Sequence, residues 1–180
     1  MKSTMYLIAI CISLISSSVN AQQLTPVDER STVKFIITNL GFDVTGTLNG
    51  LQGSIRFDEK NLSSSSVNVS VNAASVDTDN STRDKHLRGD DYFAVKTYPQ
   101  IRLTSVKIAK SVTPGYYVLF AKLTIKETTK EISFPFTAVP EAGAYRFKGE
   151  FSIKRRDFAV GGKNTISNDL KVKLDILTKK

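Results

Sequence analysis

The sequence has very few of the residues from which catalytic and metal sites are commonly built. Its 180 residues contain one cysteine, Cys11, one histidine, His86, and no tryptophan. A zinc site would have to rest on carboxylates, against the usual preference for several His or Cys ligands. A glycine-rich phosphate loop, a Gly-x-Ser-x-Gly elbow and a His-Glu-x-x-His pair are also missing from the sequence. We therefore expect no metal, no cofactor and none of the common enzyme classes.

Long apolar runs are also scarce, and the longest lies at the start of the chain. Lys2 precedes an apolar stretch over 5–15, and small residues end at Ala21, which together match a secretory signal peptide. The stretch is shorter than the ~20 residues that a membrane-spanning helix needs, so we expect no stable membrane insertion. We predict cleavage near Ala21, loss of Cys11 with residues 1–21, and export of residues 22–180 as one domain, periplasmic or secreted. A lipoprotein is disfavoured because the large Ile10 precedes Cys11.

Basic residues exceed acidic ones but do not form a block. The formal net charge of +8 falls to +7 when Lys2 leaves, and the remaining Lys and Arg residues are spread along the chain. Such an excess can attract nucleic acid, anionic lipid or a phosphorylated ligand. The even spacing favours a solvated surface, and we expect no nucleic-acid partner.

Apolar and polar residues alternate along most of the exported part, as expected for strands with one buried face. The alternation is clearest over 170–176 and recurs over 33–37, 42–48, 54–57, 67–71, 101–109, 116–125, 132–136 and 147–153. Turn signals such as Asn49-Gly50 and Pro114-Gly115 separate these segments. Pro135 indicates an edge position or a bulge. The pattern predicts an all-β, antiparallel barrel or sandwich of eight or nine strands.

The inward positions of these strands carry mostly aromatic and aliphatic side chains. The main members of this inward set are Phe35, Phe57, Leu103, Leu119, Phe134, Phe136, Phe147, Phe151, Leu170, Val172 and Leu174. They form either an ordinary core or the lining of a cavity, in which each buried methylene of a ligand would contribute ~0.8 kcal/mol. Gly46, Gly53 and Gly149 fall in phase with this set, so they either let strands coil or leave room for a lumen.

One polar segment, 77–98, breaks the alternation. Its Ser81-Thr82-Arg83-Asp84 matches a helix capping box, which predicts a short helix over about 82–87 ending at Gly89. Arg83, Asp84 and His86 form either a head-group site or a local brace in which Asp84 pairs with Arg88.

A second polar cluster, which contains Arg155 and Asp157, carries the same two interpretations. It either binds an anion or provides an ion pair with a carboxylate such as Asp84.

A series of short motifs, taken in their order along the chain, is similar to the motifs of the YceI-like family of exported bacterial proteins. The similarity covers essentially the whole exported chain. The motifs are Phe35 and Ile37, Gly41-Phe42-Asp43-Val44-Thr45-Gly46-Thr47-Leu48, Gly53-Ser54-Ile55-Arg56-Phe57-Asp58, Ala74-Ser75-Val76-Asp77-Thr78, Arg83-Asp84-Lys85-His86-Leu87, Asp91-Tyr92-Phe93, Tyr98-Pro99-Gln100-Ile101, Leu123-Thr124-Ile125, Thr128-Thr129-Lys130 and Arg155-Arg156-Asp157-Phe158. The resemblance implies an extended, eight-stranded lipocalin-like barrel with a helical insertion around 79–95. It also implies an apolar lumen that holds an isoprenoid chain such as a polyprenyl phosphate or a quinone tail. Asn39 departs from the family pattern, which often has a histidine there.

Three functions remain open at this point. The favoured one is a non-catalytic binding or carrier protein for an amphiphilic isoprenoid, with the inward set as the tail site and Arg83, Asp84, His86, Arg155 and Asp157 as candidate head-group or rim residues. The second is an enzyme that acts on a lipid or small anion, with His86 as general acid or base and Asp84 orienting it. The third is a module that uses its basic surface on anionic lipid or nucleic acid. A homodimer is compatible with each.

Overall fold

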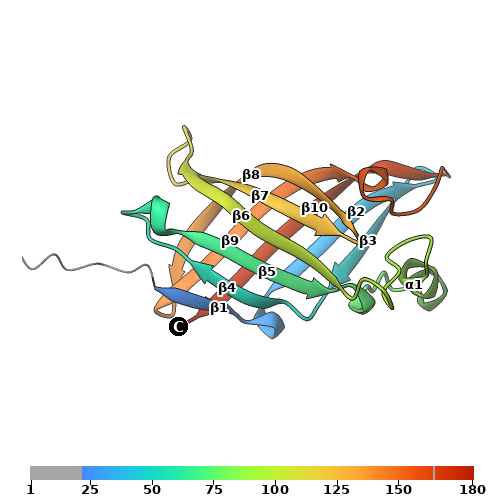
Figure 1. Ribbon diagram of the computed structural model, residues 1–180, viewed down its shortest axis with the longest axis horizontal. Coiled ribbons are helices and arrows are strands. Elements are labelled where there is room, and N and C mark those ends of the chain that lie inside the picture. The colour runs from blue at the N-terminus through green and yellow to red at the C-terminus, as the bar shows by residue number, and fades with distance from the viewer. Residues whose placement is uncertain (1–21, 164) are drawn as a thin grey trace, which may run out of the picture.

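The chain folds into a single antiparallel β-barrel with a short helix at one end (Figure 1). The computed structural model describes residues 22–163 and 165–180, so the predicted signal peptide lies outside the described residues. The strands are β1 (Gln23–Pro26), β2 (Thr32–Asn39), β3 (Phe42–Leu48), β4 (Gln52–Arg56), β5 (Ser66–Asn72), β6 (Gln100–Lys110), β7 (Tyr117–Ile125), β8 (Thr128–Glu141), β9 (Ala144–Lys154) and β10 (Ile166–Lys179). The helical elements of the described part are α1 (Ser81–Arg88) and the 3-10 turns η1 (Asp28–Arg30), η2 (Leu62–Ser64), η3 (Ala73–Ser75) and η4 (Arg155–Phe158).

Eight strands form the closed ring. Their order is β1-β4-β5-β6-β7-β8-β9-β10, and β10 returns to β1 through the pair Thr25↔Lys179. The β2–β3 hairpin continues the wall along β10 toward the α1 end. This arrangement confirms the predicted antiparallel eight-stranded barrel and excludes the sandwich.

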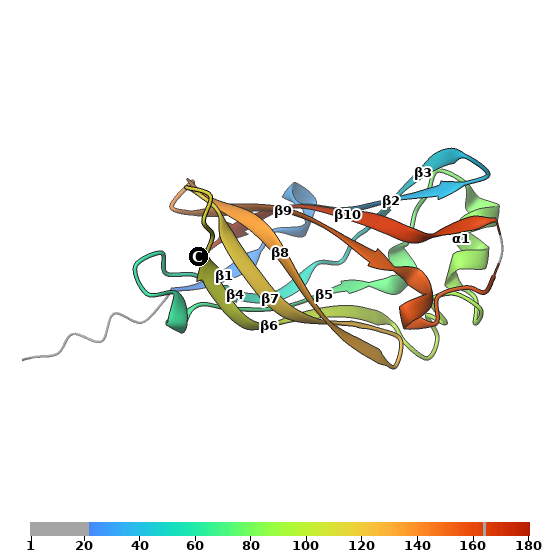
Figure 2. The ribbon, with the colours of Figure 1, turned by 90° about the horizontal axis from the view of Figure 1, so that it is seen from above.

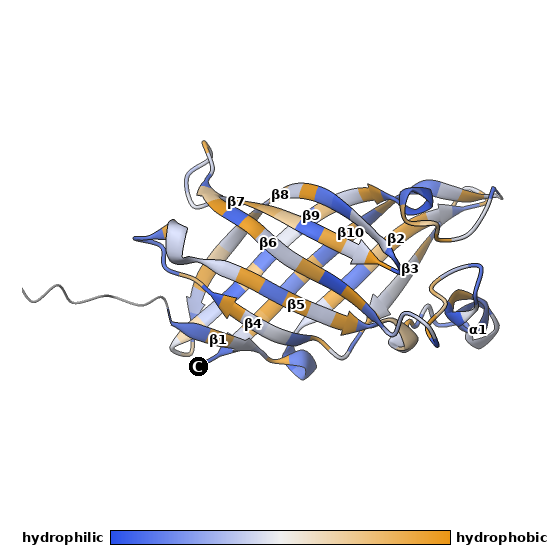
Figure 3. Cartoon of the chain, viewed as in Figure 1, coloured by the Kyte–Doolittle hydropathy of each residue, from blue (hydrophilic) through white to orange (hydrophobic). Residues whose placement is uncertain are grey.

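The period-two pattern places the inward set as predicted, because residues paired across two strands share one face of the sheet. On β10, Val172 is paired with Phe151 of β9 and with Phe35 of β2. Leu174 is paired in the same way with Gly149 and Val33. Figure 3 shows the resulting alternation of apolar and polar residues along the strands.

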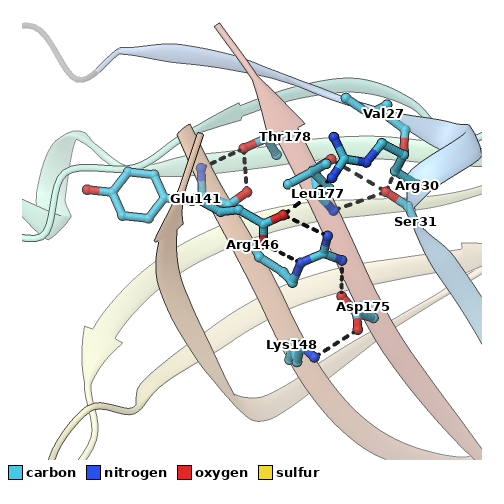
Figure 4. A network of polar contacts seen from close by, with 10 residues as sticks. Val27, Arg30, Ser31, Glu141, Arg146, Lys148, Asp175, Leu177 and Thr178 are labelled. Atoms are coloured by element: carbon cyan, nitrogen blue, oxygen red, sulfur yellow. Dashed lines mark hydrogen bonds and ion pairs between the residues drawn. The ribbon is translucent and has the colours of Figure 1, made fainter. Parts of the chain in front are cut away.

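Charged side chains brace the outer face of β8, β9 and β10 (Figure 4). Arg146 donates to Glu141 at 2.6 and 3.0 Å and to Asp175 at 2.8 Å, and Lys148 lies 3.0 Å from Asp175. The hydrogen bonds from Arg146 hold the pKa of Glu141 below its ordinary value. Surface pairs of this kind stabilise a fold only slightly, so Arg146 and Lys148 act as braces between strands at the surface.

The wall opens into a seam between β8 and β9. The ladder between them runs only from Phe136↔Gly149 to Glu141↔Ala144, and the two strands then diverge (Figure 2). Pro135 stands where this ladder stops and is paired with β7 alone, which agrees with the predicted edge position. The turn η4 fills the seam, with Phe158 fully buried in a second apolar cluster.

The helical segment covers the end of the barrel beside β3, whose outer edge carries the bridge Thr47↔Asp77. The predicted helix is present, but the predicted capping box at Ser81 is wrong. Asn80 is the N-cap and accepts from the Arg83 amide at 3.0 Å. Asn caps a helix as well as Ser does, and Asp84 is engaged inside the fold. No helix in the described ranges combines the length and apolar character needed to cross a membrane.

The three glycines in phase with the inward set behave differently. At Gly46 an added Cβ would lie 2.2 Å from the ring of Phe35, and at Gly149 it would lie 3.0 Å from the ring of Phe134. These two positions face inward, and a neighbouring phenylalanine covers each of them. Gly53 does not face inward: its φ is +122° and a Cβ would meet the Asn68 carbonyl oxygen at 2.2 Å. Glycine is required there by the close approach of β5.

Candidate functional site

The barrel encloses a cavity of about 580 Å³. Small-molecule sites commonly measure about 300–1,000 Å³, so this cavity is large enough for a ligand. Its lining includes the whole predicted inward set, namely Phe35, Phe57, Leu103, Leu119, Phe134, Phe136, Phe147, Phe151, Leu170, Val172 and Leu174. The lining also includes apolar residues outside that set, among them Val33, Val44, Val67, Val69, Ile101 and Ile153. The same strand alternation places these residues on inward faces.

Many of the lining side chains keep part of their surface uncovered although they point inward. Phe35, Leu103, Phe151, Val172 and Leu174 are only half-buried. In a close-packed core such side chains would be covered by their neighbours. The interior is therefore a cavity over part of its length.

Five aromatic rings close the end of the barrel far from α1. Phe57 follows β4 directly, and its ring stands edge-on to the rings of Tyr117, Phe136, Tyr145 and Phe147, with centroid distances of 5.1, 6.2, 5.2 and 5.5 Å. Phe57 is 4 % exposed. Edge-on contacts are favourable aromatic geometries, so the cluster forms a rigid floor for the cavity.

The α1 end of the cavity carries the polar groups. Asn80, Thr82 and His86 line the cavity and are exposed to solvent, so this end forms the mouth. Arg83 also lines it and is held by Thr78, to whose hydroxyl and carbonyl oxygens it donates at 2.7 and 2.6 Å. A fixed guanidinium beside an exposed imidazole can bind an anionic or hydrogen-bond-accepting head group.

Asp84 does not line the cavity, and the structure gives it the bracing role. It is 5 % exposed, and one of its carboxylate oxygens accepts from the Thr78 amide at 2.9 Å and the Thr78 hydroxyl at 2.6 Å. The suggested partner Arg88 instead donates to the carbonyl oxygens of Ala74 and Val76. The helix is thus tied to the chain that precedes it by side-chain-to-backbone bonds, which residue spacing alone does not reveal.

Arg155 lines the cavity from beneath the loop that follows η4. It is 3 % exposed and donates to the carbonyl oxygens of Val160, Gly162, Ile166 and Ser167 at 2.8 to 3.1 Å. Burial lowers the pKa of the Arg155 guanidinium from its ordinary value.

The structure shows other partners for both members of the suggested ion pair. Arg155 donates to backbone carbonyl oxygens, and Asp84 accepts from Thr78. Asp157 is exposed on η4 and does not line the cavity. Among the described residues, no three His, Cys, Asp or Glu side chains are grouped so as to hold a metal ion.

The fold and the cavity define a class of protein: a small closed antiparallel barrel with an apolar interior and a polar mouth. The chain belongs to the YceI-like family, whose domain model matches residues 24–177. A UPF0312 protein of Photorhabdus laumondii is 35% identical over 137 residues, which cover 72% of this chain and 70% of the relative. A UPF0312 protein of Pectobacterium atrosepticum is 34% identical over 139 residues, covering 73% and 71% of the two chains.

Solved structures share the fold. The YCEI protein of Campylobacter jejuni, in a mutant form, is 27% identical with a TM-score of 0.68, covering 79% of this chain and 94% of that one. BcnA of Burkholderia cenocepacia has a TM-score of 0.79 at 24% identity, covering 84% and 98%. A polyisoprenoid binding domain from Saccharophagus degradans has a TM-score of 0.68 at 16% identity, covering 87% and 97%.

Proposed function

We propose that this protein is a non-catalytic binding or carrier protein for an amphiphilic isoprenoid lipid, either a polyprenyl phosphate or a quinone-like molecule. The observation that carries the proposal is the cavity of about 580 Å³ lined by half-buried apolar side chains. The shared fold with a protein described as a polyisoprenoid binding domain supports the choice of lipid.

The position of the polar groups gives the ligand a direction. The tail would extend toward Phe57, where the lining is aromatic, and the head would lie at the mouth near Arg83 and His86. Each methylene moved from water into the lumen contributes ~0.8 kcal/mol, so a long tail supplies most of the affinity. Charge at the mouth would then distinguish a phosphate from a quinone head group.

The proposed place of action is the periplasm or the extracellular space. It follows from the signal peptide predicted over 1–21, with cleavage near Ala21. A lumen that shields an apolar tail from water is useful in such a compartment, because a free isoprenoid would have to cross an aqueous space.

Native mass spectrometry of protein purified from its own host tests the proposal. We expect an adduct whose mass equals that of an isoprenoid lipid and which is released by organic solvent. The amount of adduct is then compared between two variants. Leu174→Lys places a cation on the apolar lining and should reduce the adduct, whereas Lys173→Leu, on the outward face of the same strand, should keep it. A folded wild-type protein that shows only its bare mass, and takes up no added isoprenoid, would refute the function.

Two further measurements separate the alternatives. If the protein were an enzyme that relied on His86, the variant His86→Ala would lose turnover. For a binding protein we expect the affinity of the lumen for its ligand to be unchanged in this variant, because the tail supplies most of the affinity. A basic surface module would lose its ligand as salt is added, whereas binding in the lumen should hardly respond.

A further inference from the structure

Phe57 is the central ring of the cavity floor, because it contacts each of the other four rings of the cluster. Phe57 lines the cavity, whereas Tyr117 and Tyr145, two of the four rings it contacts, do not. Phe57 thus lies between the open lumen and the ring layer behind it.

The layer behind Phe57 ends in polar groups. Tyr117 is 6 % exposed, and burial together with a hydrogen bond to Glu59 raises its pKa to about 12. A tail that passed Phe57 would have to separate its ring from those of Tyr117 and Tyr145, which stand edge-on to it at 5.1 and 5.2 Å, and would lose these contacts. The apolar path stops at Phe57.

The other end of the path is also fixed. Arg83 is anchored by two hydrogen bonds to Thr78, and Asp84 ties the same helix to Thr78 from inside. A ligand whose head is held at this mouth and whose tail ends at Phe57 has a set length.

We propose that Phe57 is the specificity-determining residue for tail length, and that the lumen selects isoprenoids by the number of isoprene units that fit between the α1 mouth and this ring. The inference rests on the proposed function, because it assumes that the cavity takes an isoprenoid tail. A shorter tail leaves lumen surface uncovered and loses its burial contribution, and a longer tail must leave methylenes in water.

Competition among isoprenoid alcohols tests the inference. The purified wild-type protein, stripped of lipid, is incubated with an equimolar series from farnesol to solanesol, and the bound lengths are counted by native mass spectrometry. We expect a single preferred length. Phe57→Ala, which removes the floor ring, should shift that preference to an alcohol longer by about one isoprene unit, and Phe57→Trp should shift it shorter.

Phe158→Ala is the matched control, because it removes a fully buried ring that does not line the cavity. It should lose stability comparable to that lost by Phe57→Ala and keep the wild-type length preference. Should Phe57→Ala fail to fold, Phe57→Leu gives the same shift in smaller measure.

The outcomes separate the inference from the proposed function. A wild-type protein that takes up none of the alcohols overturns both. A wild-type protein that binds them without a preferred length, or a folded Phe57→Ala or Phe57→Leu protein with an unchanged preference, overturns the inference while the function stands.

Discussion

Filling the lumen should stabilise the protein and weaken its binding of the ligand at the same time. Val172 points into the cavity midway along β10 and is half-buried, so a larger side chain has room to cover uncovered apolar surface. In Val172→Phe the added ring should contribute roughly 1–2 kcal/mol. At roughly 2–4 °C per kcal/mol for a domain of this size, Tm should rise by roughly 2–8 °C.

The same ring takes space from the ligand. If it displaces about three methylenes of tail, binding loses roughly 2.4 kcal/mol, or about fiftyfold in affinity. Tm is measured by circular dichroism on lipid-free protein, and affinity by titration with a fluorescent polyene isoprenoid.

Ile176→Phe is the control, because Ile176 lies on the same strand and face but is 7 % exposed. Overpacking there should cost about 1–3 kcal/mol. A Val172→Phe protein that melts lower than the wild type and still binds normally would show that side chains fill the middle of the barrel.

Three further predictions concern the polar contacts. Arg155→Met should destabilise by at least about 3 kcal/mol in urea titrations because it leaves four carbonyl oxygens without their donor; a loss under 1 kcal/mol would contradict this. Asp84→Asn should weaken the two bonds from Thr78, costing about 1–3 kcal/mol, with faster amide exchange over 78–88; unchanged exchange would contradict it. The folded pKa of Glu141 is lowered by hydrogen bonds from Arg146. Burial acts to raise the pKa of Asp175, but the hydrogen bonds and charges of Arg146 and Lys148 together outweigh it, so this pKa is lowered too. The stability that these two carboxylates contribute is thus complete above their unfolded pKa values of about 4. It is lost as the pH falls through their folded pKa values. Urea midpoints should decline with acid below about pH 4, and Arg146→Met should make that decline shallower.

The strand faces could be predicted from the sequence because a period of two converts position directly into side-chain direction. Phe35, Phe151 and Val172 were selected by alternation alone and all line the cavity. β1 was missed because its four residues are too few to display a period, although Leu24 within it is 2 % exposed.

The open lumen, by contrast, could not be predicted from alternation. Alternation says that a side chain faces inward, whereas the space in front of it depends on how the whole ring closes. The roles of Asp84 and Arg155 were also beyond the pattern, since their partners are backbone groups of loops. Gly53 was misplaced because its unusual φ rotates its Cβ direction out of the strand alternation.

The pairing of β10 has a consequence for how the protein is made. Its strand partners are β9, β2 and β1, and the pair Thr25↔Lys179 joins the two ends of the described chain. Contacts between residues so distant in sequence form late and slow the folding rate. Until β10 has been synthesised, the edges of β1, β2 and β9 lack their partner and no cavity exists. Closure of the barrel therefore waits for β10, which suits a chain that is proposed to cross a membrane before it closes around its ligand.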